Sequence, residues 1–398
     1  MPGRCFTASS TRPEPVSTEL GGDAPLARAV VCVPARNEAL TLPRLIRSLA
    51  GQNGASPESR LRVVVLANNC TDDTVAVLDA LGHGPIGATL RLRVVEASLA
   101  PEVAHVGTAR SMALDAGRAW LNDEGVADGV LLSTDADAVA PPDWVSANLA
   151  ALDGAELVGG RLVIDPEAER PDPAVADLHA RIERYWAGVR ALEDLIDPPP
   201  HDPAPRHGDH VAASLALRAS LYEAVGGLPL LACGEDNALV ARVRRAGGRV
   251  RHCPAVSIAV SDRAAGRVEG GMATEMLRRA RVAGGQEGYV LPPARLWLAL
   301  IERRRDWRLA WEAGDGWPDA LRRLGLPQAV IDAMAAGIAD EPCPNAIAFV
   351  ERLDALAGAP GPEPEAQPLD RVLTDLDALR LRLLAEGHGT PVGAAPAA

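Results

Sequence analysis

The chain has 398 residues, 47% hydrophobic and 23% charged, a composition typical of a globular protein with two or three domains, or with one large α/β domain and additions. Its 53 acidic residues outnumber the 40 basic ones, and the net charge of −13 argues against generic nucleic-acid binding, which needs a basic surface. Every residue counted as lysine or arginine is an arginine, which excludes P-loop and Schiff-base chemistry that depends on a lysine.

The cysteines are scattered, and none forms a C-x-x-C pair; they are Cys5, Cys32, Cys70, Cys233, Cys253 and Cys343. This pattern is typical of a reduced compartment and offers no zinc cage. No apolar run approaches the ~20 residues of a membrane span, and residues 1–27 lack the apolar core of a signal peptide. We therefore expect a cytoplasmic protein with a flexible N-terminal segment and no transmembrane segment.

The first half of the chain alternates short apolar runs with stretches of helical periodicity. Strands are predicted at residues 29–35, 61–67, 90–96 and 129–134. The helices that follow them are predicted near residues 42–49, 72–81, 106–120 and 142–152. Four such alternations, at spacings that suit right-handed crossovers, predict an open, largely parallel α/β sheet.

The second half continues with a strand at residues 156–164 and a long helix at 173–195, which three consecutive prolines end. We then predict a strand at 211–217, a helix before Gly226-Gly227, a helix over 234–246 and two short strands within 249–261. From about residue 270 the chain is rich in arginine, alanine and leucine, a composition that favours helices.

The strongest chemical signal is the sequence Thr134-Asp135-Ala136-Asp137 at the end of the fourth strand. Ligands of open α/β sheets bind outside the carboxyl ends of the strands. Asp135 and Asp137 therefore lie where both can reach one cation, and an oxygen-only ligand set favours Mg²⁺ or Mn²⁺. The alternative reading is a polar turn that merely ends the strand.

Eight short motifs follow one another along the chain: VPARNE (33–38), ANNCTDDT (67–74), GTAR (107–110), DAD (135–137), PPDW (141–144), GG (159–160), VGG (225–227) and GED (234–236). In these motifs and in their order, residues 28–270 resemble family 2 glycosyltransferases of the GT-A fold. The resemblance implies a metal-dependent transferase that moves a sugar from a UDP- or GDP-sugar to an acceptor hydroxyl with inversion. It also implies that the first three motifs line the nucleotide, that DAD holds the metal, and that GED lies near the acceptor.

The resemblance assigns a role to each acidic residue. Asp137 is the expected metal ligand, and Asp135 is expected to contact the metal or the donor. Asp236 is the expected general base for the acceptor hydroxyl, with Glu235 beside it. The alternative for this pair is a helix N-terminus, where the dipole favours acidic residues.

The residues expected to bind the nucleotide-sugar are Pro34, Ala35, Arg36, Glu38, Asn68, Arg110, Asp135, Arg263 and Arg267. Alternatives stay open for some of them: Arg110 fits a surface arginine equally well, and Arg263 and Arg267 fit a solvated helix face. The first motif also fits a helix start, in which Asn37 caps the helix.

Two departures from the family pattern bear on the substrates. Asn68, Asn69 and Cys70 stand where the family carries an acidic stretch that reads the base, so the donor nucleotide stays open. The late histidine that supplies some relatives with a third metal ligand is not plainly placed. The loop 201–210 (HDPAPRHGDH) matches no standard zinc pattern, and it suits an acceptor-gating loop in which His207 or His210 touches the acceptor.

We expect a GT-A domain over residues 28–270, a helical extension over 271–358 that covers the active site or makes a homodimer, a Pro-rich linker over 359–368, and a helix with a disordered tail over 369–398. Three rivals of other classes remain. They are a sugar-phosphate nucleotidyltransferase, a non-catalytic nucleotide-sugar-binding scaffold and a nicotinamide dehydrogenase, although the glycine-rich loops of the first and last are absent. The acceptor is unknown, with a small soluble molecule preferred and a lipid left open.

Overall fold

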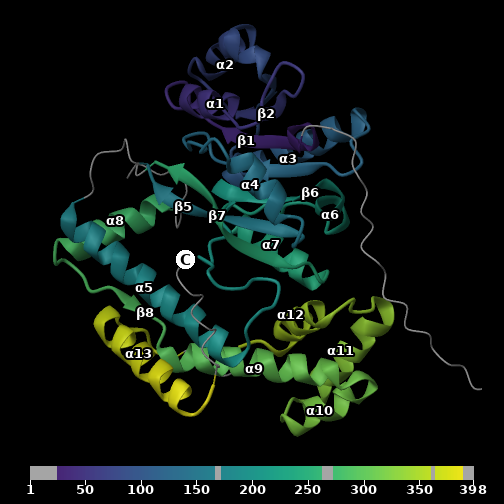
Figure 1. Cartoon of the computed structure of the whole chain (residues 1–398), viewed down its shortest axis with the longest axis vertical. Coiled ribbons are helices and arrows are strands. Elements are labelled where there is room, and N and C mark those ends of the chain that lie inside the picture. The colour runs from purple at the N-terminus through teal and green to yellow at the C-terminus, as the bar shows by residue number, and fades with distance from the viewer. Residues whose placement is uncertain (1–24, 166–171, 262–271, 360–363, 389–398) are drawn as a thin grey trace, which may run out of the picture.

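A computed structural model describes residues 25–165, 172–261, 272–359 and 364–388. Within these ranges seven strands form one sheet in the order β3-β2-β1-β4-β6-β5-β7 (Figure 1). The strands are β1 Ala29–Ala35, β2 Leu61–Asn68, β3 Leu90–Ala97, β4 Val130–Ser133, β5 Leu157–Ile164, β6 Leu215–Arg218 and β7 Val250–Val260. β6 runs antiparallel to β4 and β5, and the remaining neighbours are parallel. The predicted open, mostly parallel α/β sheet is confirmed.

Helices cover both faces of the sheet because the strands are buried on both faces. On one face lie α1 Leu42–Ala50, α2 Thr74–His83 and α4 Trp144–Ala151. On the other lie α3 Val106–Asp123, α6 Ala219–Ala224 and α7 Glu235–Arg245. Every residue of β1 and β2 is buried, as expected of strands covered on two sides. In α1 the apolar residues at helical spacing are all buried in the cluster on the first face; they are Leu42, Leu45, Ile46 and Leu49.

The later helices gather beside the β5–β7 half of the sheet, away from α1 and α2 (Figure 1). They are α5 Pro173–Ile196, α8 Met272–Ala283, α9 Ala294–Glu312, α10 Trp317–Arg323, α11 Gln328–Asp340, α12 Ala346–Ala357 and α13 Leu369–Ala385. Apolar side chains of α5, α9 and α13 form one cluster, and those of α9 to α12 form another. The short strands β8 Val290–Leu291 and β9 Gln367–Pro368 pair with each other, so part of the predicted Pro-rich linker is a strand.

Two expectations about the later strands are wrong. The two short strands expected within 249–261 are the single strand β7, although Pro254 interrupts its apolar pattern. The strand expected at 211–217 begins with a 3-10 turn, η3 Ala212–Ser214, and β6 starts only at Leu215. Three other 3-10 turns are described: η1 Pro25–Arg28, η2 Pro85–Ala88 and η4 Gly314–Gly316.

None of the helices in the described ranges is both long enough and apolar enough to cross a bilayer. The expected N-terminal segment and C-terminal tail lie outside the described residues, apart from their inner ends.

Candidate functional site

The candidate site lies at the carboxyl ends of β1, β2 and β4, which are parallel neighbours in the sheet. The segments that leave these strands carry the residues of the first, second and fourth motifs. Because the carboxyl ends of parallel strands meet at one edge, these segments lie side by side. Pro34 and Ala35 are the last two residues of β1, and Asn68 is the last residue of β2.

Arg110 joins the two acidic motifs. It lies on α3, and its side chain is 4% exposed. Its guanidinium donates to Asp135 Oδ1 (2.7 Å), to Glu235 Oε1 (3.3 Å), to Ser133 Oγ (2.9 Å) and to the carbonyl of Ala212 (3.3 Å). The alternative reading of Arg110 as a surface arginine is therefore wrong.

The electrostatics of Arg110 follow from these contacts. Burial works against its charge, but the carboxylates of Asp135 and Glu235 outweigh burial and hold the pKa of Arg110 above its usual value. A charged guanidinium thus holds the end of β4 and the start of α7 together. Ser133 and the Ala212 carbonyl were not predicted as partners of Arg110, because the one visible signal was a polar residue at the end of an apolar strand.

Glu235 and Asp236 form the first turn of α7, so the helix N-terminus predicted for them is present. Gly234 precedes them with φ of +79°, a conformation that favours glycine. Glu235 is buried against Arg110, whereas Asp236 is half-buried. The backbone N–H of Ala212 donates to Asp236 Oδ2 (3.1 Å), and the N–H of Asn237 donates to Asp236 Oδ1 (2.7 Å). Of the two acids, Asp236 is therefore the more open to a substrate.

The first motif is folded tightly against the second. Asn37 has φ of +54°, and its side chain bonds to Thr71 in both directions (Oδ1 accepts at 2.7 Å, Nδ2 donates at 3.2 Å) instead of capping α1. Glu38 is 7% exposed and accepts from the hydroxyl of Thr41. Arg36 is exposed and donates to the carbonyl of Ala104 (3.2 Å). Arg36 and Asn37 are thus exposed, whereas Glu38 is buried.

At the end of β2 the two asparagines have different environments. Asn69 (φ +49°) bonds the backbone of Leu99 through both ends of its amide, at 2.8 and 2.9 Å, and therefore shapes the loop. Asn68 is 3% exposed, and its Oδ1 has no hydrogen-bond partner within the described part of the chain. A buried acceptor without a donor is costly, so Asn68 has hydrogen-bonding capacity left for a ligand.

The residues at the end of β4 fit a divalent cation that is shared with a substrate. Asp135 is 39% exposed in its side chain, and Asp137 is half-buried. Among the described residues no three His, Cys, Asp or Glu side chains are close enough to hold a metal by themselves. Two carboxylates suffice for Mg²⁺ or Mn²⁺ when water and substrate phosphate complete the shell. Arg263 and Arg267, expected at the diphosphate, lie outside the described residues.

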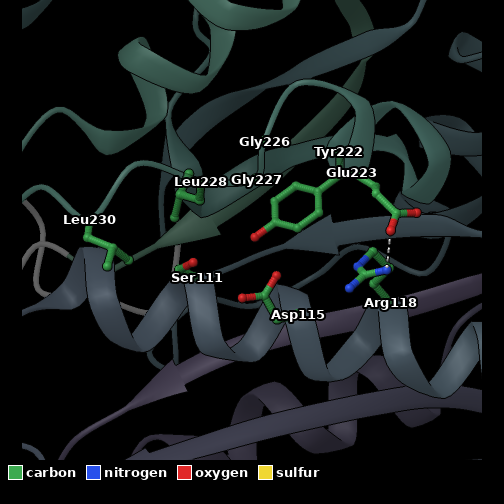
Figure 2. Close-up of a pocket in the computed structure, with 9 residues that line it drawn as sticks. All are labelled: Ser111, Asp115, Arg118, Tyr222, Glu223, Gly226, Gly227, Leu228 and Leu230. Carbon is green, nitrogen blue, oxygen red and sulfur yellow. Dashed lines mark hydrogen bonds and ion pairs between the residues drawn. The ribbon is translucent and has the colours of Figure 1, made fainter.

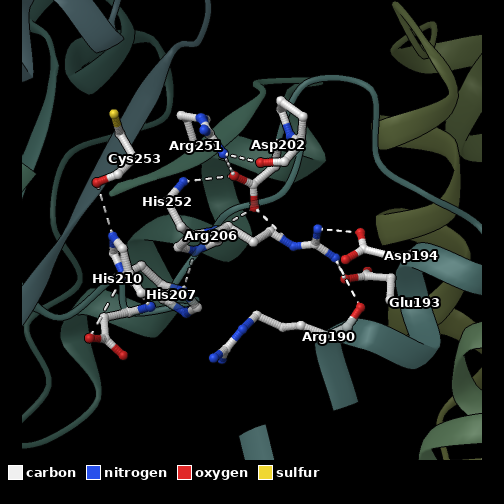
Figure 3. Close-up of polar contacts among 12 residues, drawn as sticks. Arg190, Glu193, Asp194, Asp202, Arg206, His207, His210, Arg251, His252 and Cys253 are labelled. Carbon is white, nitrogen blue, oxygen red and sulfur yellow. Dashed lines mark hydrogen bonds and ion pairs between the residues drawn. The ribbon is translucent and has the colours of Figure 1, made fainter. Parts of the chain in front are cut away.

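The loop 201–210 holds a histidine network (Figure 3). His207 Nε2 donates to the carbonyl of Cys253 (3.3 Å), and His207 Nδ1 accepts from the N–H of Asp209 (3.0 Å). His210 bonds His252 and Asn237, both at 3.0 Å. Burial, aided by Arg244 near His210 and by His252 near both rings, lowers the pKa of each of His207 and His210 to about 4. The network holds the loop against β7 and α7.

A pocket of about 350 Å³ lies between α3 and α6 (Figure 2). Its lining includes Ser111, Asp115 and Tyr222, and the ring of Tyr222 points toward the other two. Of the predicted donor, metal and base residues that the structure describes, none lines it. The pocket is therefore separate from the candidate site.

The open, mostly parallel sheet with flanking helices, with acids at the end of β4 and at the start of α7, is the GT-A type of α/β fold that the motifs predicted. Residues 30–187 match the family model described as Glycosyl transferase family 2, and the chain thus carries a domain of that family. The resemblance drawn from the motifs is confirmed, and in general terms the protein is a glycosyltransferase. No curated protein matches the chain significantly.

Several solved structures are similar to the chain. TarS 1–349 of S. aureus shares 17% identity, with 92% of this chain and 93% of that chain covered and a TM-score of 0.40. The mannosyltransferase PcManGT of Pyrobaculum calidifontis, solved with GDP-Man and Mn²⁺, shares 20% identity over 83% and 86% of the two chains, with a TM-score of 0.43. Glucosyl-3-phosphoglycerate synthase of Mycobacterium tuberculosis, solved with Mn²⁺, UDP and phosphoglyceric acid, shares 18% over 67% and 82%, with a TM-score of 0.38.

Proposed function

We propose that this protein transfers a sugar from a nucleoside-diphosphate sugar to an acceptor hydroxyl, with inversion at the anomeric carbon and with a divalent metal at Asp135 and Asp137. The observation that carries the proposal is the bridge made by buried Arg110. It fixes the end of β4, where a donor diphosphate would bind, beside the first turn of α7, where an acceptor would bind.

On the donor side, Asp137 and the oxygen of Asp135 that faces away from Arg110 are the proposed ligands of Mn²⁺ or Mg²⁺. When bound, the metal stabilises the negative charge that builds up on the leaving diphosphate. Asn68 offers its buried amide oxygen to an N–H group of the base. Arg36 and the backbone of residues 34–38 border the same edge.

On the acceptor side, Asp236 is the proposed general base. Each of its carboxylate oxygens accepts one backbone N–H, which leaves lone pairs directed elsewhere. The acceptor oxygen forms a bond to the anomeric carbon as the bond to the diphosphate breaks, and the hydroxyl proton passes to Asp236. Glu235 holds Arg110 and is the less suitable base, because its carboxylate is buried and paired.

Several expectations go with this proposal and remain predictions. They are a UDP- or GDP-sugar donor, a cytoplasmic location, the domain boundary near residue 270, and a helical extension that covers the active site or makes a homodimer. The acceptor is left open between a small soluble molecule and a lipid.

Calorimetric titration with UDP, GDP, CMP and ADP, with and without Mn²⁺, tests the donor site. We expect one nucleotide to bind in a metal-dependent manner and Asp137→Ala to weaken it by about tenfold or more, which is about 1.4 kcal/mol. The matched control is Asp153→Ala, since Asp153 is exposed at the end of α4. If no nucleotide binds the wild-type protein in either condition, the transferase proposal is wrong; if nucleotide binds but no donor is ever turned over, the scaffold reading replaces it.

A further inference from the structure

His210 closes a ring of contacts around the proposed base. The backbone leads from His210 to Ala212, whose N–H donates to Asp236 Oδ2 (3.1 Å). Asp236 precedes Asn237, and the Asn237 side chain returns to His210 Nε2 (3.0 Å). Because the ring is closed, a shift of the His210 side chain changes where Ala212 lies relative to the first turn of α7.

A second set of contacts, made by His252 and Asp202, orients the His210 ring (Figure 3). His210 Nδ1 lies 3.0 Å from His252 Nε2, and His252 Nδ1 lies 2.6 Å from Asp202 Oδ2. His252 is 6% exposed and Asp202 is 5% exposed, so water competes little for these bonds. Asp202 is itself fixed by the backbone N–H of His252 (2.9 Å) and by Arg251 (2.7 Å).

Donor and acceptor roles can be assigned without conflict along the hydrogen-bonded series of side chains Asp202, His252, His210 and Asn237. The Asp202 carboxylate accepts, so His252 Nδ1 carries the proton between them. Between the two imidazoles one nitrogen donates and the other accepts, and the Asn237 amide, with both a donor and an acceptor, completes either direction. No ring nitrogen of His210 or His252 therefore lacks a partner, which restricts the His210 ring to one orientation.

We propose that His210, oriented by His252 and Asp202, is a positioning residue that holds Asp236 in place for the acceptor. This inference rests on the proposed function, in which Asp236 is the base. His210 touches neither donor nor metal in this scheme, so it acts through Ala212 and Asn237 alone.

The loop that carries His210 has other attachments to the sheet. The same loop is anchored to β5 by the bond from Leu162 N–H to Asp209 Oδ2 (3.3 Å). The loop backbone also packs onto Gly159, where an added Cβ would lie 2.2 Å from the Asp209 carbonyl oxygen and 2.9 Å from His210 Cα. A truncated side chain at position 210 thus leaves the loop attached and removes its bonds to His252 of β7 and to Asn237 of α7.

The experiment compares His210→Ala, His210→Gln and the control His83→Ala, in which the side chain lost is 81% exposed. For each full-length protein we would measure nucleotide affinity by calorimetry, and the kcat and KM for release of nucleoside diphosphate from UDP-glucose, UDP-N-acetylglucosamine and GDP-mannose. Hydrogen exchange would follow the amides of Ala212 and Asn237.

We expect His210→Ala to lower kcat by about tenfold to a hundredfold, with nucleotide affinity unchanged and faster exchange at both amides. Because glutamine can still bond Asn237, His210→Gln should recover part of kcat.

Three results would overturn the positioning role. They are a kcat of His210→Ala equal to that of His83→Ala, a loss of nucleotide affinity in His210→Ala, and unchanged exchange at Ala212 and Asn237. A wild-type protein that binds none of the nucleotides would instead refute the proposed function, and the exchange measurement would still decide whether His210 holds this segment.

Discussion

Arg110 is the residue on which the candidate site depends most. Its removal leaves Glu235, 7% exposed in its side chain, without a counter-charge. Breaking a buried ion pair on one side costs about 3–5 kcal/mol. We therefore expect Arg110→Ala to lower the free energy of unfolding by that order and to reduce kcat, and urea denaturation with a turnover assay would measure both.

Arg118→Ala is the matched control for that experiment. Arg118 lies two turns further along α3 and pairs with Glu223, which is 64% exposed. Exposed ion pairs contribute about 0–1 kcal/mol, so this variant should unfold almost as the wild type does. Equal destabilisation by the two substitutions would contradict the bridging role of Arg110.

His207 gives the protein a defined response to acid. The neutral ring donates to the Cys253 carbonyl and accepts from the Asp209 N–H, so a second proton on Nδ1 would have to displace that N–H bond, and the Asp209 carboxylate lies 3.7 Å from Nδ1. Burial, and then His252, lowers its pKa from 6.5 to about 4. The unfolded chain therefore binds more protons between these values, and stability falls as the pH drops through that window.

The size of this effect can be measured. For His207 alone the loss between pH 7 and pH 5 is roughly 1–2 kcal/mol. In thermal or urea unfolding at the two pH values, His207→Gln should show a shallower loss than the wild type, because glutamine does not titrate. His83→Gln, at an exposed position, should keep the wild-type slope. Parallel slopes for His207→Gln and the wild type would refute the assignment.

At the level of single residues, the motifs predicted the positions of residues relative to the strands and helices. They did not predict what each side chain contacts. Asp135 and Asp137 follow β4 and Glu235 opens α7, as the spacing indicated. The partner of Arg110 at α7 is 125 residues away in sequence, and no local pattern encodes such a pair. Asn68 and Asn69 are chemically identical, and only backbone geometry separates the loop-shaping residue from the one with an unpartnered oxygen.

Among the elements, the parallel strands were predictable because each is a short, buried apolar run between helices with clear periodicity. β7 was not, because Pro254 suggests a break. The proline is tolerated because β7 is the last strand of the sheet, and β5 is the one strand it pairs with in the described chain, apart from an isolated bridge between Ala259 and Val139. The register shifts opposite it, between Gly159 and Arg161, so Pro254 falls within an irregular part of the ladder.

The loop 201–210 packs onto β5 at Gly159, and this contact predicts that a methyl group added at Gly159 destabilises the protein. An added Cβ at Gly159 would lie 2.2 Å from the Asp209 carbonyl oxygen, a clash with backbone that a side-chain rotation cannot relieve. We expect Gly159→Ala to destabilise the protein by about 1–3 kcal/mol and to lower kcat, because the loop that carries Ala212 must move. Unfolding midpoints and turnover would test both.

Gly154→Ala is the control for this substitution. Gly154 follows α4, and a Cβ there would meet no atom of the described chain within 4 Å. Wild-type stability is expected for it. If Gly159→Ala also unfolds and turns over as the wild type does, the loop is not held by this contact.

For the whole molecule, composition predicted a helical C-terminal region but not what it packs against. Within the described residues, the apolar side chains of α5 share a cluster with α9 and α13 and none with the two clusters of the sheet. α12 instead approaches α7, where Asn345 donates to the Gly247 carbonyl (2.8 Å) and Arg352 donates to the Arg245 carbonyl (3.0 Å). Such docking depends on surfaces that are distant in sequence, which periodicity alone does not specify.

Because the apolar clusters are separate, we predict that the C-terminal helices can unfold locally while the sheet stays folded. Leu376 of α13 is 3% exposed, and its Cδ1 lies 3.2 Å from where a Cβ on Gly188 of α5 would be. Leu376→Ala removes this close contact at a cost of about 2–5 kcal/mol. By hydrogen exchange we expect α5 and α13 to lose protection while β1, β2 and β4 keep theirs, since no α13 side chain belongs to their cores. Leu381→Ala, at a 62% exposed position of the same helix, should change neither region. An equal loss of protection in β1, β2 and β4 would mean that the sheet and the C-terminal helices unfold as one cooperative unit, and would contradict the separate unfolding inferred from the separate clusters.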